Sequence, residues 1–382
     1  MRGARGSRLV AAAGCLAVIM LGAACSGHPR ALMAKPGPRE VRSQPASSPS
    51  GRSASARSVS GSAAVAGKAG AYQVSEQQLT FAEPPHTGPA GQYLTQRTLV
   101  INVRYPHASR SGGLGPARGP FPLIMFAPGF MQCDGTYSDL LDTWAGAGYV
   151  VAAVNFPRTD CRVGAAAYEP DLVNQPWDMS YALSALLARS ARSGGPLSGL
   201  LSSRRIAAAG QSDGGDTVAA LAANTCCTDH RLTAVAVLSG AEWPPMPGRY
   251  FPGGAPPMLF VQGSADVVNP PGTSVQLYTA DRARARYYLD LPGATHMVPY
   301  QGTNRVERIV AAETLAFFNR YVLDEAGALA AMTRDGNVRG AASLVSGGRL
   351  PPAQPPALSL LFNPCFLGRP GLLVLSRRGV VT

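Results

Sequence analysis

The sequence has few of the features that mark metal-binding and membrane-spanning proteins. Its 382 residues include five histidines and seven cysteines, and no two cysteines have the Cys-x-x-Cys spacing of a metal site. The apolar run from Leu9 to Leu21 is shorter than the roughly 20 residues that cross a bilayer as a helix. No acidic residue follows Asp335. These absences direct attention to chemistry that side chains can perform without a metal.

Net positive charge is also lacking where the chain is long enough to fold. The formal net charge is +12, but residues 1–70 hold 10 basic residues and 1 acidic residue, residues 71–344 hold 20 and 21, and residues 345–382 hold 4 and none. The long middle of the chain is therefore close to neutral and offers no basic face. This distribution excludes nucleic acid as the expected partner.

The N-terminus has the pattern of an export signal. Three arginines precede the apolar run, and small residues then lead to Cys25. This segment resembles the lipobox of bacterial lipoproteins, in which the cysteine is lipidated, although Gly22 stands where a branched aliphatic residue is usual. We expect residues 1–25 to be a signal and Cys25 to anchor the chain at the outer face of the cell membrane. Ordinary secretion after cleavage beside Ala24 is the alternative.

Composition divides the remaining chain into three parts. Residues 26–70 are rich in Ser, Pro, Gly and Arg and nearly lack aromatic residues, so they bury too little apolar surface to offset the entropy of ordering and are expected to form a disordered tether. Residues 71–345 are enough for one enzyme-sized domain and contain no internal repeat. Residues 346–382 form a Pro-rich tail whose structure the sequence does not specify.

Strand-length apolar segments alternate with helix-length segments in the middle part. The expected strands are Thr98 to Val103, Leu123 to Ala127, Tyr149 to Asn155, Arg205 to Ala209, Thr233 to Leu238, Met258 to Gln262 and Arg286 to Leu291. The expected helices are Tyr137 to Trp144, Gln175 to Ala191, Asp213 to Ala223, Ser274 to Ala283 and Arg305 to Tyr321. Several strands are continuously apolar, which predicts an α/β fold with a mostly parallel sheet flanked by helices. Ligands bind such sheets at the carboxyl ends of the strands.

The segment Gly210-Gln-Ser-Asp-Gly214 fits the pattern G-x-S-x-G. An expected strand ends just before it and an expected helix begins at Asp213, which is the setting that lifts a serine hydroxyl clear of a sheet. A glycine-rich turn with a helix-capping serine is the alternative. The setting favours Ser212 as a nucleophile.

A serine nucleophile needs a base, and the base needs a carboxylate to orient it. Of the five histidines, His296 lies just beyond the last expected strand, at the same sheet edge as Ser212. Asp266 follows the preceding expected strand by four residues, whereas the competing Asp290 lies inside a strand. The chain order Ser212, Asp266, His296 is that of α/β-hydrolases and differs from the chymotrypsin and subtilisin orders.

Attack on an ester creates an oxyanion that needs backbone N–H donors. We expect one donor to be the N–H of Asp213, at the start of the helix. The second is expected from the turn after the strand that ends at Ala127, with Phe130 preferred and Met131 as the alternative.

These residues resemble the secreted serine hydrolases related to chlorophyllase, plasma platelet-activating-factor acetylhydrolase and the cutinase-like polyester hydrolases. The resemblance covers about 95–345 and rests on four motifs: Phe126-Ala-Pro-Gly-Phe130, Gly210-Gln-Ser-Asp-Gly214, Gly263-Ser-Ala-Asp266 and Ala294-Thr-His296. It implies the α/β-hydrolase fold with a minimal lid, and ester hydrolysis with no metal or organic cofactor. Gln211 and Asp213 depart from the family, which often has His or Trp before the nucleophile and an apolar residue after it.

The fold also suggests a disulfide. Cys133 and Cys161 each lie six residues past strands that are neighbours in this fold, so we expect them to be bridged. Cys226 and Cys227 can pair with each other, or one of them can pair with Cys365; the sequence leaves both open.

The leading hypothesis is an exported serine esterase or lipase acting on a small-molecule or lipid ester, as a monomer. Gln211, Met131 and Trp243 are the expected substrate contacts, with Gly164 to Asn174 and Trp243 to Pro257 as rims of the site. A thioesterase or acyltransferase with the same triad is one alternative. A catalytically inactive cell-surface binding protein on the same scaffold is the other.

Overall fold

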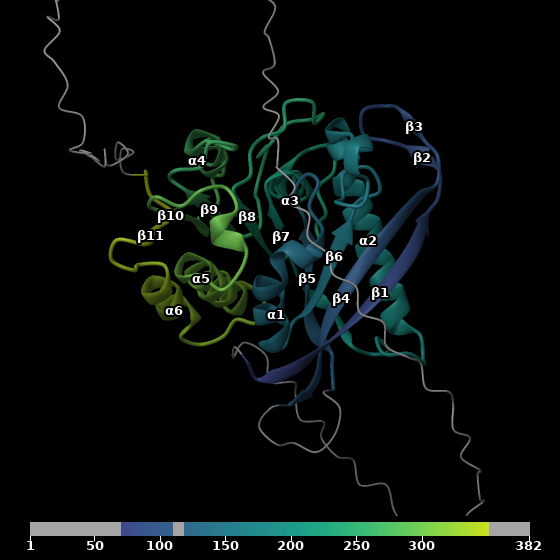
Figure 1. Ribbon diagram of the computed structural model, residues 1–382, viewed down its shortest axis with the longest axis horizontal. Helices are drawn as coiled ribbons and strands as arrows, with labels where there is room; N and C mark the ends of the chain where they lie inside the picture. The colour runs from purple at the N-terminus through teal and green to yellow at the C-terminus, as the bar shows by residue number, and fades with distance from the viewer. Residues whose placement is uncertain (1–69, 110–117, 351–382) are drawn as a thin grey trace, which may run out of the picture. The chain divides into compact units, whose positions relative to one another are not determined.

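The computed structural model describes residues 70–109 and 118–350, and their central feature is a nine-stranded sheet (Figure 1). The strand order is β1-β4-β6-β5-β7-β8-β9-β10-β11. The strands are β1 (Tyr72–Glu83), β4 (Arg97–Ser109), β5 (Phe121–Ala127), β6 (Val150–Asn155), β7 (Leu201–Gln211), β8 (Ala234–Leu238), β9 (Met258–Gly263), β10 (Arg286–Leu291) and β11 (Ser343–Ser346). A separate pair consists of β2 (His86–Thr87) and β3 (Tyr93–Leu94). The expected signal peptide with Cys25, the tether up to residue 69, the tail from residue 351 and Cys365 lie outside the described residues.

The sheet is mostly parallel, as predicted. Strands β6, β5, β7, β8, β9 and β10 pair with their neighbours in parallel, whereas β1, β4 and β11 join antiparallel at the two edges. All seven expected strands are present. Strand β1 was not predicted, because its residues are mostly polar and only partly buried. It is an edge strand held along its whole length by β4.

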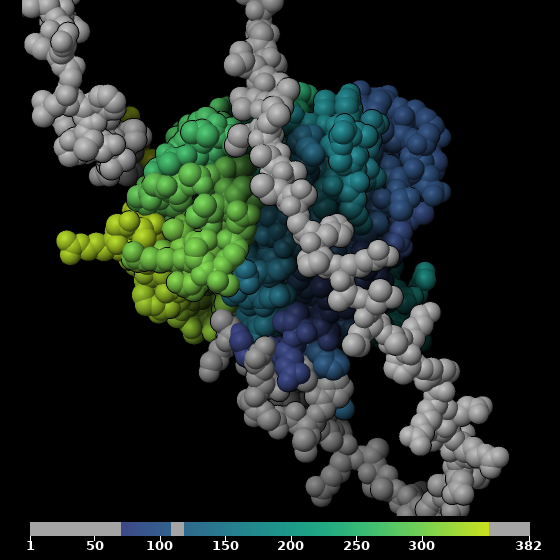
Figure 2. Space-filling view, in the orientation of Figure 1, coloured from purple at the N-terminus to yellow at the C-terminus, as the bar shows by residue number. Residues whose placement is uncertain are grey.

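Helices cover both faces of the sheet. One face carries α1 (Ser138–Gly146), α5 (Arg305–Tyr321) and α6 (Ala328–Asp335), and the other carries α2 (Gln175–Ala191), α3 (Asp213–Ala223) and α4 (Pro271–Ala280) (Figure 1). Short 3-10 turns are η1 (Asp134–Tyr137), η2 (Gly164–Ala166), η3 (Glu169–Asn174) and η4 (Val298–Tyr300). In the space-filling view, residues of the first strands gather on the right and residues after α5 on the left, at opposite edges of the sheet (Figure 2). In the described ranges no helix is both long and apolar enough to cross a bilayer.

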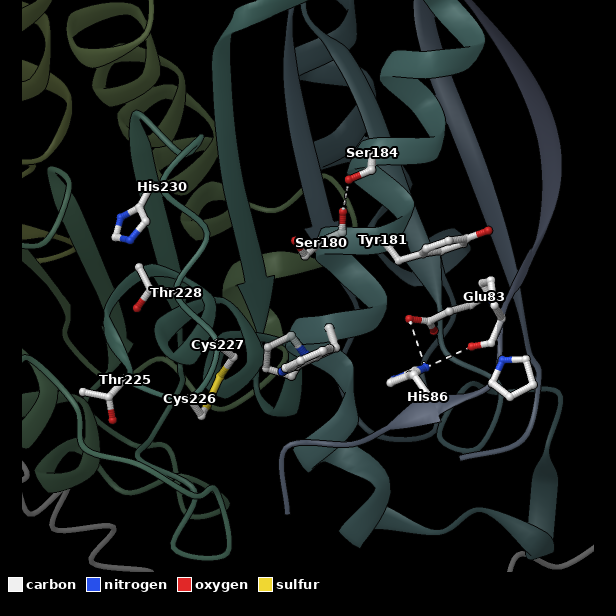
Figure 3. Close-up of a pocket in the computed structure, with 14 residues that line it drawn as sticks. Glu83, His86, Ser180, Tyr181, Ser184, Thr225, Cys226, Cys227, Thr228 and His230 are labelled. Atoms are coloured by element: carbon white, nitrogen blue, oxygen red, sulfur yellow. Dashed lines mark hydrogen bonds and ion pairs between the residues drawn. A yellow bond between two sulfur atoms is a disulfide. The ribbon is translucent and has the colours of Figure 1, made fainter. Parts of the chain in front are cut away.

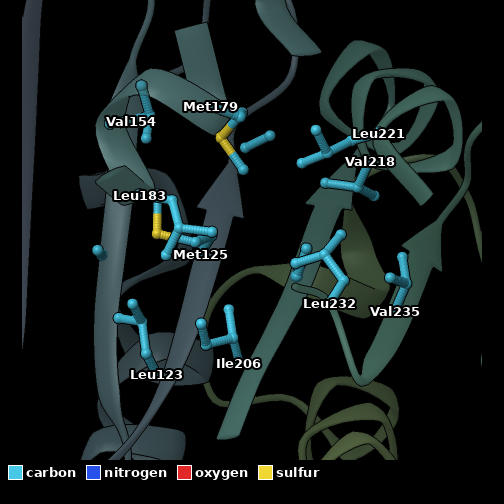
Figure 4. Packing of buried hydrophobic residues seen from close by; sticks show 14 of the residues in the cluster. Leu123, Met125, Val154, Met179, Leu183, Ile206, Val218, Leu221, Leu232 and Val235 are labelled. Carbon is cyan, nitrogen blue, oxygen red and sulfur yellow. The ribbon is translucent and has the colours of Figure 1, made fainter. Parts of the chain in front are cut away.

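Alternation along the strands builds two cores. In β5, Leu123 and Met125 face the core beneath α2 and α3, while Ile124 and Phe126 face the core beneath α1 and α5. Figure 4 shows the first of these cores, where the β5 residues meet Leu183 of α2. Burying a side chain of this size contributes about 1.5–3 kcal/mol. Because both faces of these strands are apolar and must be covered, the strands lie at the centre of the sheet.

A buried ion cluster holds the start of α2 against the sheet. Arg97 of β4 donates to both carboxylate oxygens of Asp178 at 2.7 and 2.6 Å and to both of Asp171 at 3.1 and 2.7 Å. Since the planar guanidinium satisfies two carboxylates at once, the cluster fixes η3 and the first turn of α2 relative to β4. The cluster thereby fixes Asp171, which belongs to the segment 164–174 that was predicted to form a rim of the site.

Two disulfides lie among the described residues. Cys133 and Cys161 are bridged, as predicted, with their Cα atoms 5.2 Å apart. The open question about Cys226 and Cys227 is answered by a bond between these adjacent residues. The first bridge joins the loop after β5 to the loop after β6. Disulfides of this kind are typical of proteins that fold in an oxidising environment.

Removing the Cys133–Cys161 bridge is expected to destabilise the domain. The bond closes a loop with a sequence separation of 28, and the chain-entropy relation then gives about 3–4 kcal/mol. Urea unfolding of the Cys133→Ala/Cys161→Ala double variant measures the loss. The matched control is Cys226→Ala/Cys227→Ala, which opens a bridge with a separation of 1, for which the same relation gives only about 1 kcal/mol. Equal losses in the two double variants would contradict the prediction.

Candidate active site

Ser212 lies at a sharp turn between β7 and α3. Its backbone has φ 56° and ψ −124°, a left-handed conformation that is unfavourable for a residue with a side chain. The Ser212 N–H donates to Leu238 O on β8 at 2.9 Å, and Ser212 O accepts the N–H of Asp216 at 3.0 Å. The neighbouring strand and the first turn of α3 thus hold the strained residue in place, with its hydroxyl at the carboxyl edge of the sheet.

The two glycines of the motif are required by close packing. A Cβ on Gly210 would lie 2.0 Å from Gly214 O, and a Cβ on Gly214 would lie 1.9 Å from Ala127 O. Any side chain at either position would collide with backbone. The motif therefore lets α3 start directly against β5 and β7, which fixes the position of Ser212 between them.

The side chains of Ser212, His296 and Asp266 form a hydrogen-bonded line. His296 Nε2 lies 2.9 Å from Ser212 Oγ, and His296 Nδ1 lies 2.7 Å from Asp266 Oδ2. An ionised carboxylate only accepts hydrogen bonds, so Nδ1 carries the proton and Nε2 presents a lone pair to the serine hydroxyl. The structure thus brings the three predicted residues together in the order that a nucleophile, its base and an orienting carboxylate require.

Asp266 is held by four donors. Oδ1 accepts the N–H groups of Val268 and Asn269 at 2.9 and 3.0 Å, and Oδ2 accepts Gln262 Nε2 at 3.1 Å in addition to His296. Burial raises the pKa of this carboxyl, but the bonds from His296 and the two N–H groups outweigh it, and the pKa stands below its ordinary value. Asp266 is therefore anionic at neutral pH, as the tautomer of His296 requires.

Gln262 is a site residue that was not predicted from the sequence. It is fully buried at the end of β9, and its amide also donates to Asn269 O at 3.0 Å, so it fixes the loop that carries Asp266. A polar residue that ends an otherwise apolar strand, four positions before the carboxylate, was the available signal. A second contact joins this loop to the His296 loop, because Ala265 N–H donates to Ala294 O at 2.9 Å.

The loop after β5 supplies one candidate oxyanion donor. Met131 was the alternative to Phe130, and the structure contradicts it: Met131 N–H donates to Thr159 O at 2.7 Å and is already occupied. Phe130 N–H, in contrast, has no hydrogen-bond acceptor in residues 70–109 and 118–350, and Asp213 N–H is bonded there to no residue other than its own carboxyl. Neither N–H is bonded to another residue of this range, so both are candidate donors to an oxygen bound beside Ser212.

The carboxyl of Asp213 is unusual for its position. The residue is 7% exposed, and its Oδ2 has no hydrogen-bond partner within the described part of the chain. Burial, together with the negative charge of Glu169 on η3, raises the pKa of Asp213 to about 7. Burial also raises the pKa of Asp216 well above its ordinary value, although Ala241 N–H donates to it at 2.5 Å. The negative charge of Asp213 beside the nucleophile is therefore suppressed below about pH 7.

The three expected substrate contacts, Gln211, Trp243 and Met131, lie in different surroundings. Gln211 is fully buried beneath the triad, so its expected role as a substrate contact is wrong, because its amide is bonded to protein groups. Trp243 packs in a small cluster with Met246 and lines a cavity of about 420 Å³ that includes none of the triad residues. Met131 is 43% exposed and directly follows Phe130, so it remains at the surface beside the site.

Exposed apolar side chains surround the triad loops. Of the large apolar residues that the described surface exposes, Val267 and Val268 follow Asp266, Val298 lies two residues after His296, and Met131 belongs to the loop after β5. Val267 is 87% exposed. These four residues give the loops around Ser212 an apolar surface.

A larger groove lies elsewhere on the described surface. It has a volume of about 820 Å³, and Figure 3 shows Glu83 and His86 on one side and the Cys226–Cys227 bridge on the other. No triad residue lines it. Nor do the described residues include a cluster of three His, Cys, Asp or Glu side chains placed to hold a metal ion. Hydrogen-bond geometry, rather than cavity size, identifies the triad as the candidate site.

Comparisons with known proteins do not add to this geometry. No protein-family model matches the chain, and no curated protein matches it either. Inferences about what the site does therefore depend on its own residues.

Proposed function

We propose that this chain is an exported serine hydrolase of the α/β-hydrolase fold that cleaves carboxylic esters. The observation that supports this most directly is the hydrogen-bonded line from Ser212 Oγ through His296 to Asp266, at 2.9 and 2.7 Å. The α/β-hydrolase fold is supported by the strand–turn–helix around Ser212 and by the chain order Ser212, Asp266, His296. The two disulfides support export, and lipidation of Cys25 is the proposed means of anchoring.

The proposed reaction passes through an acyl-enzyme. His296 Nε2 takes the proton of Ser212 Oγ as the oxygen attacks the ester carbonyl carbon, and the resulting oxyanion accepts hydrogen bonds from Phe130 N–H and Asp213 N–H. The ester C–O bond then breaks, and the imidazolium returns its proton to the leaving alcohol. Water, deprotonated by His296, attacks the acyl-enzyme and releases the acid and free Ser212. Asp266 stabilises the imidazolium in both steps.

The apolar side chains around the site favour esters with an apolar acyl or alcohol part. Met131, Val267, Val268 and Val298 would cover such groups and would themselves leave water on binding.

The test is turnover of short- and medium-chain p-nitrophenyl esters by the purified protein, together with labelling by a fluorophosphonate probe. Turnover with labelling of Ser212 is the expected result. Labelling without turnover of any ester would favour the thioesterase or acyltransferase alternative, since the nucleophile would be competent for another acyl donor or acceptor. Neither turnover nor labelling would overturn the proposal and favour an inactive binding protein.

Asp213 predicts a specific pH dependence of this activity. Its carboxyl, with a pKa of about 7, is neutral below that pH and anionic above it, and an anion beside the Asp213 N–H opposes the developing oxyanion. For a neutral ester, kcat/KM of the wild type is expected to fall relative to Asp213→Asn as pH rises through 7, by about fivefold for ~1 kcal/mol of repulsion. Profiles between about pH 5 and pH 9 measure the effect.

The control for this prediction is Asp324→Asn, which removes a carboxylate whose side chain is 87% exposed in the loop after α5. The pH profile of kcat/KM for Asp324→Asn is expected to match that of the wild type. Parallel profiles for wild type and Asp213→Asn would show that ionisation of Asp213 does not reach the oxyanion.

A further inference from the structure

Two fully buried polar side chains beneath the triad have no part in the chemistry described so far. Tyr137, at the end of η1, and Gln211, at the end of β7, are 74 positions apart in the sequence and share a hydrogen bond of 2.8 Å. Burying a hydroxyl and an amide costs free energy unless every polar atom finds a partner. Their partners are backbone groups of the two loops that flank Ser212.

The direction of each hydrogen bond in this group follows from chemistry. His296 O is a carbonyl and only accepts, so the group 3.3 Å from it must be the amide nitrogen, Nε2, of Gln211. Oε1 of Gln211 then faces Tyr137 and accepts its hydroxyl proton. The hydroxyl oxygen in turn accepts Gly129 N–H at 3.1 Å. Burial raises the pKa of Tyr137 above its ordinary value, so the phenol keeps its proton.

These bonds connect the two halves of the proposed catalytic machinery. Gly129 directly precedes Phe130, whose N–H is the candidate oxyanion donor, and His296 is the candidate base. Gln211 Nε2 also lies 3.2 Å from His296 Nε2 and can donate to it while that nitrogen is unprotonated. In the imidazolium both groups are donors, so the bond to His296 O is the one that persists through the reaction. The chain of bonds therefore runs from the oxyanion loop to the base, beneath the nucleophile.

The loop reaches this position only because residue 129 is glycine. A Cβ there would lie 2.8 Å from Gln211 Oε1 and 3.2 Å from Ser212 Cβ. The absence of a side chain lets the backbone of the oxyanion loop approach Gln211 closely enough for Tyr137 to bridge the two.

We propose that Tyr137 and Gln211 form a positioning relay that holds the Phe130 N–H and the His296 imidazole at a fixed separation across Ser212. The proposal rests on the proposed function and adds to it two positioning residues that do not touch substrate. A relay of this kind matters most when the oxyanion and the imidazolium are both present, in the transition state. Its loss is expected to lower kcat and to leave KM unchanged.

The test is a double-mutant cycle with Tyr137→Phe, Gln211→Met and the variant that carries both changes, assayed with p-nitrophenyl butyrate. Since small displacements of catalytic groups cost up to about 100-fold, each single change is expected to lower kcat by about 10- to 100-fold. The double variant is expected to be no slower than the slower single variant, because breaking one bond already interrupts the relay. Tyr149→Phe is the matched control: it removes another buried hydroxyl, that of the residue directly before the amino end of β6, which donates to Asn319 of α5 at 2.9 Å, and it should leave kcat unchanged.

Four outcomes would overturn the relay. They are an unchanged kcat in Tyr137→Phe, an effect confined to KM, additive effects in the double variant, and an equal loss in Tyr149→Phe. A folded wild type that turns over no ester would overturn the proposed function together with the relay. An active wild type with unaffected variants would overturn the relay alone.

Discussion

Replacing Ser212 with alanine is expected to lower kcat for p-nitrophenyl butyrate by about 10⁴- to 10⁶-fold. The hydroxyl at 2.9 Å from His296 Nε2 is the atom that bonds to the acyl carbon, and alanine has no atom to replace it. The residual rate would come from water attacking an ester that is still bound beside the Phe130 and Asp213 N–H groups. The measurement is kcat of the purified variant, with loss of fluorophosphonate labelling as a second readout.

The fold should tolerate this change. Ser212 is held through its backbone N–H and carbonyl, which alanine keeps, although alanine inherits the unfavourable φ of 56°. The control is Ser274→Ala, which removes the hydroxyl of a fully buried serine that is bonded to Tyr288 on the opposite face from α1 and should retain full activity. A Ser212→Ala protein that kept more than about one hundredth of the wild-type kcat would contradict the assignment of the nucleophile.

Replacing Asp266 with asparagine is expected to lower kcat by about 10³- to 10⁴-fold. The structure dictates how the new amide would lie. Val268 and Asn269 both donate to Oδ1, so the amide oxygen would take that place and the NH₂ group would face His296. His296 Nδ1 would then have to accept a hydrogen bond from the asparagine NH₂ group, so the imidazole proton would have to move to Nε2. In that tautomer Nε2 cannot take the proton of Ser212.

The matched control is Asp290→Asn, which changes the competing carboxylate inside β10. Since Asp266, and not Asp290, contacts His296, this variant is expected to keep the wild-type kcat. Both variants should be compared at neutral pH with the same ester, and near-ultraviolet circular dichroism should confirm that each is folded. A large loss in Asp290→Asn with a small loss in Asp266→Asn would reverse the assignment of the orienting carboxylate.

Much of the fold was predictable because it depends on local pattern. The expected limits of α2, α3 and α5 agree with the structure. Helices α2 and α5 each bury one face, whereas α3 is buried all round and begins directly after the Ser212 turn. The central strands were predictable because strands buried on both faces are continuously apolar. By contrast, β1 alternates polar and partly apolar residues at the sheet edge, and the short α6 shows too few turns to stand out. Neither has a sequence signal comparable to that of the central elements.

The candidate triad was predictable for a related reason. The turn after a strand of a parallel sheet always lies at the carboxyl edge, so Ser212, Asp266 and His296 could be assigned to one edge from their places in the chain alone. The same reasoning paired Cys133 with Cys161, since both lie in loops that leave neighbouring strands at that edge. The identity of the reactive residue types and their order along the chain thus came from the sequence.

Only the tertiary structure decided which polar groups are already occupied. Phe130 and Met131 are adjacent, and the sequence does not show which of their N–H groups is free to bind an oxyanion. In the structure Met131 N–H donates to Thr159 O, whereas Phe130 N–H has no acceptor among the described residues. Gln211 stood next to the nucleophile and was expected to meet substrate, but it is turned inward toward Tyr137 and His296. These bonds join residues up to 85 positions apart. Local sequence sets the periodicity of the backbone and the chemistry of each residue. The pairing of hydrogen-bond donors with acceptors depends on how distant segments pack, which the sequence alone does not reveal.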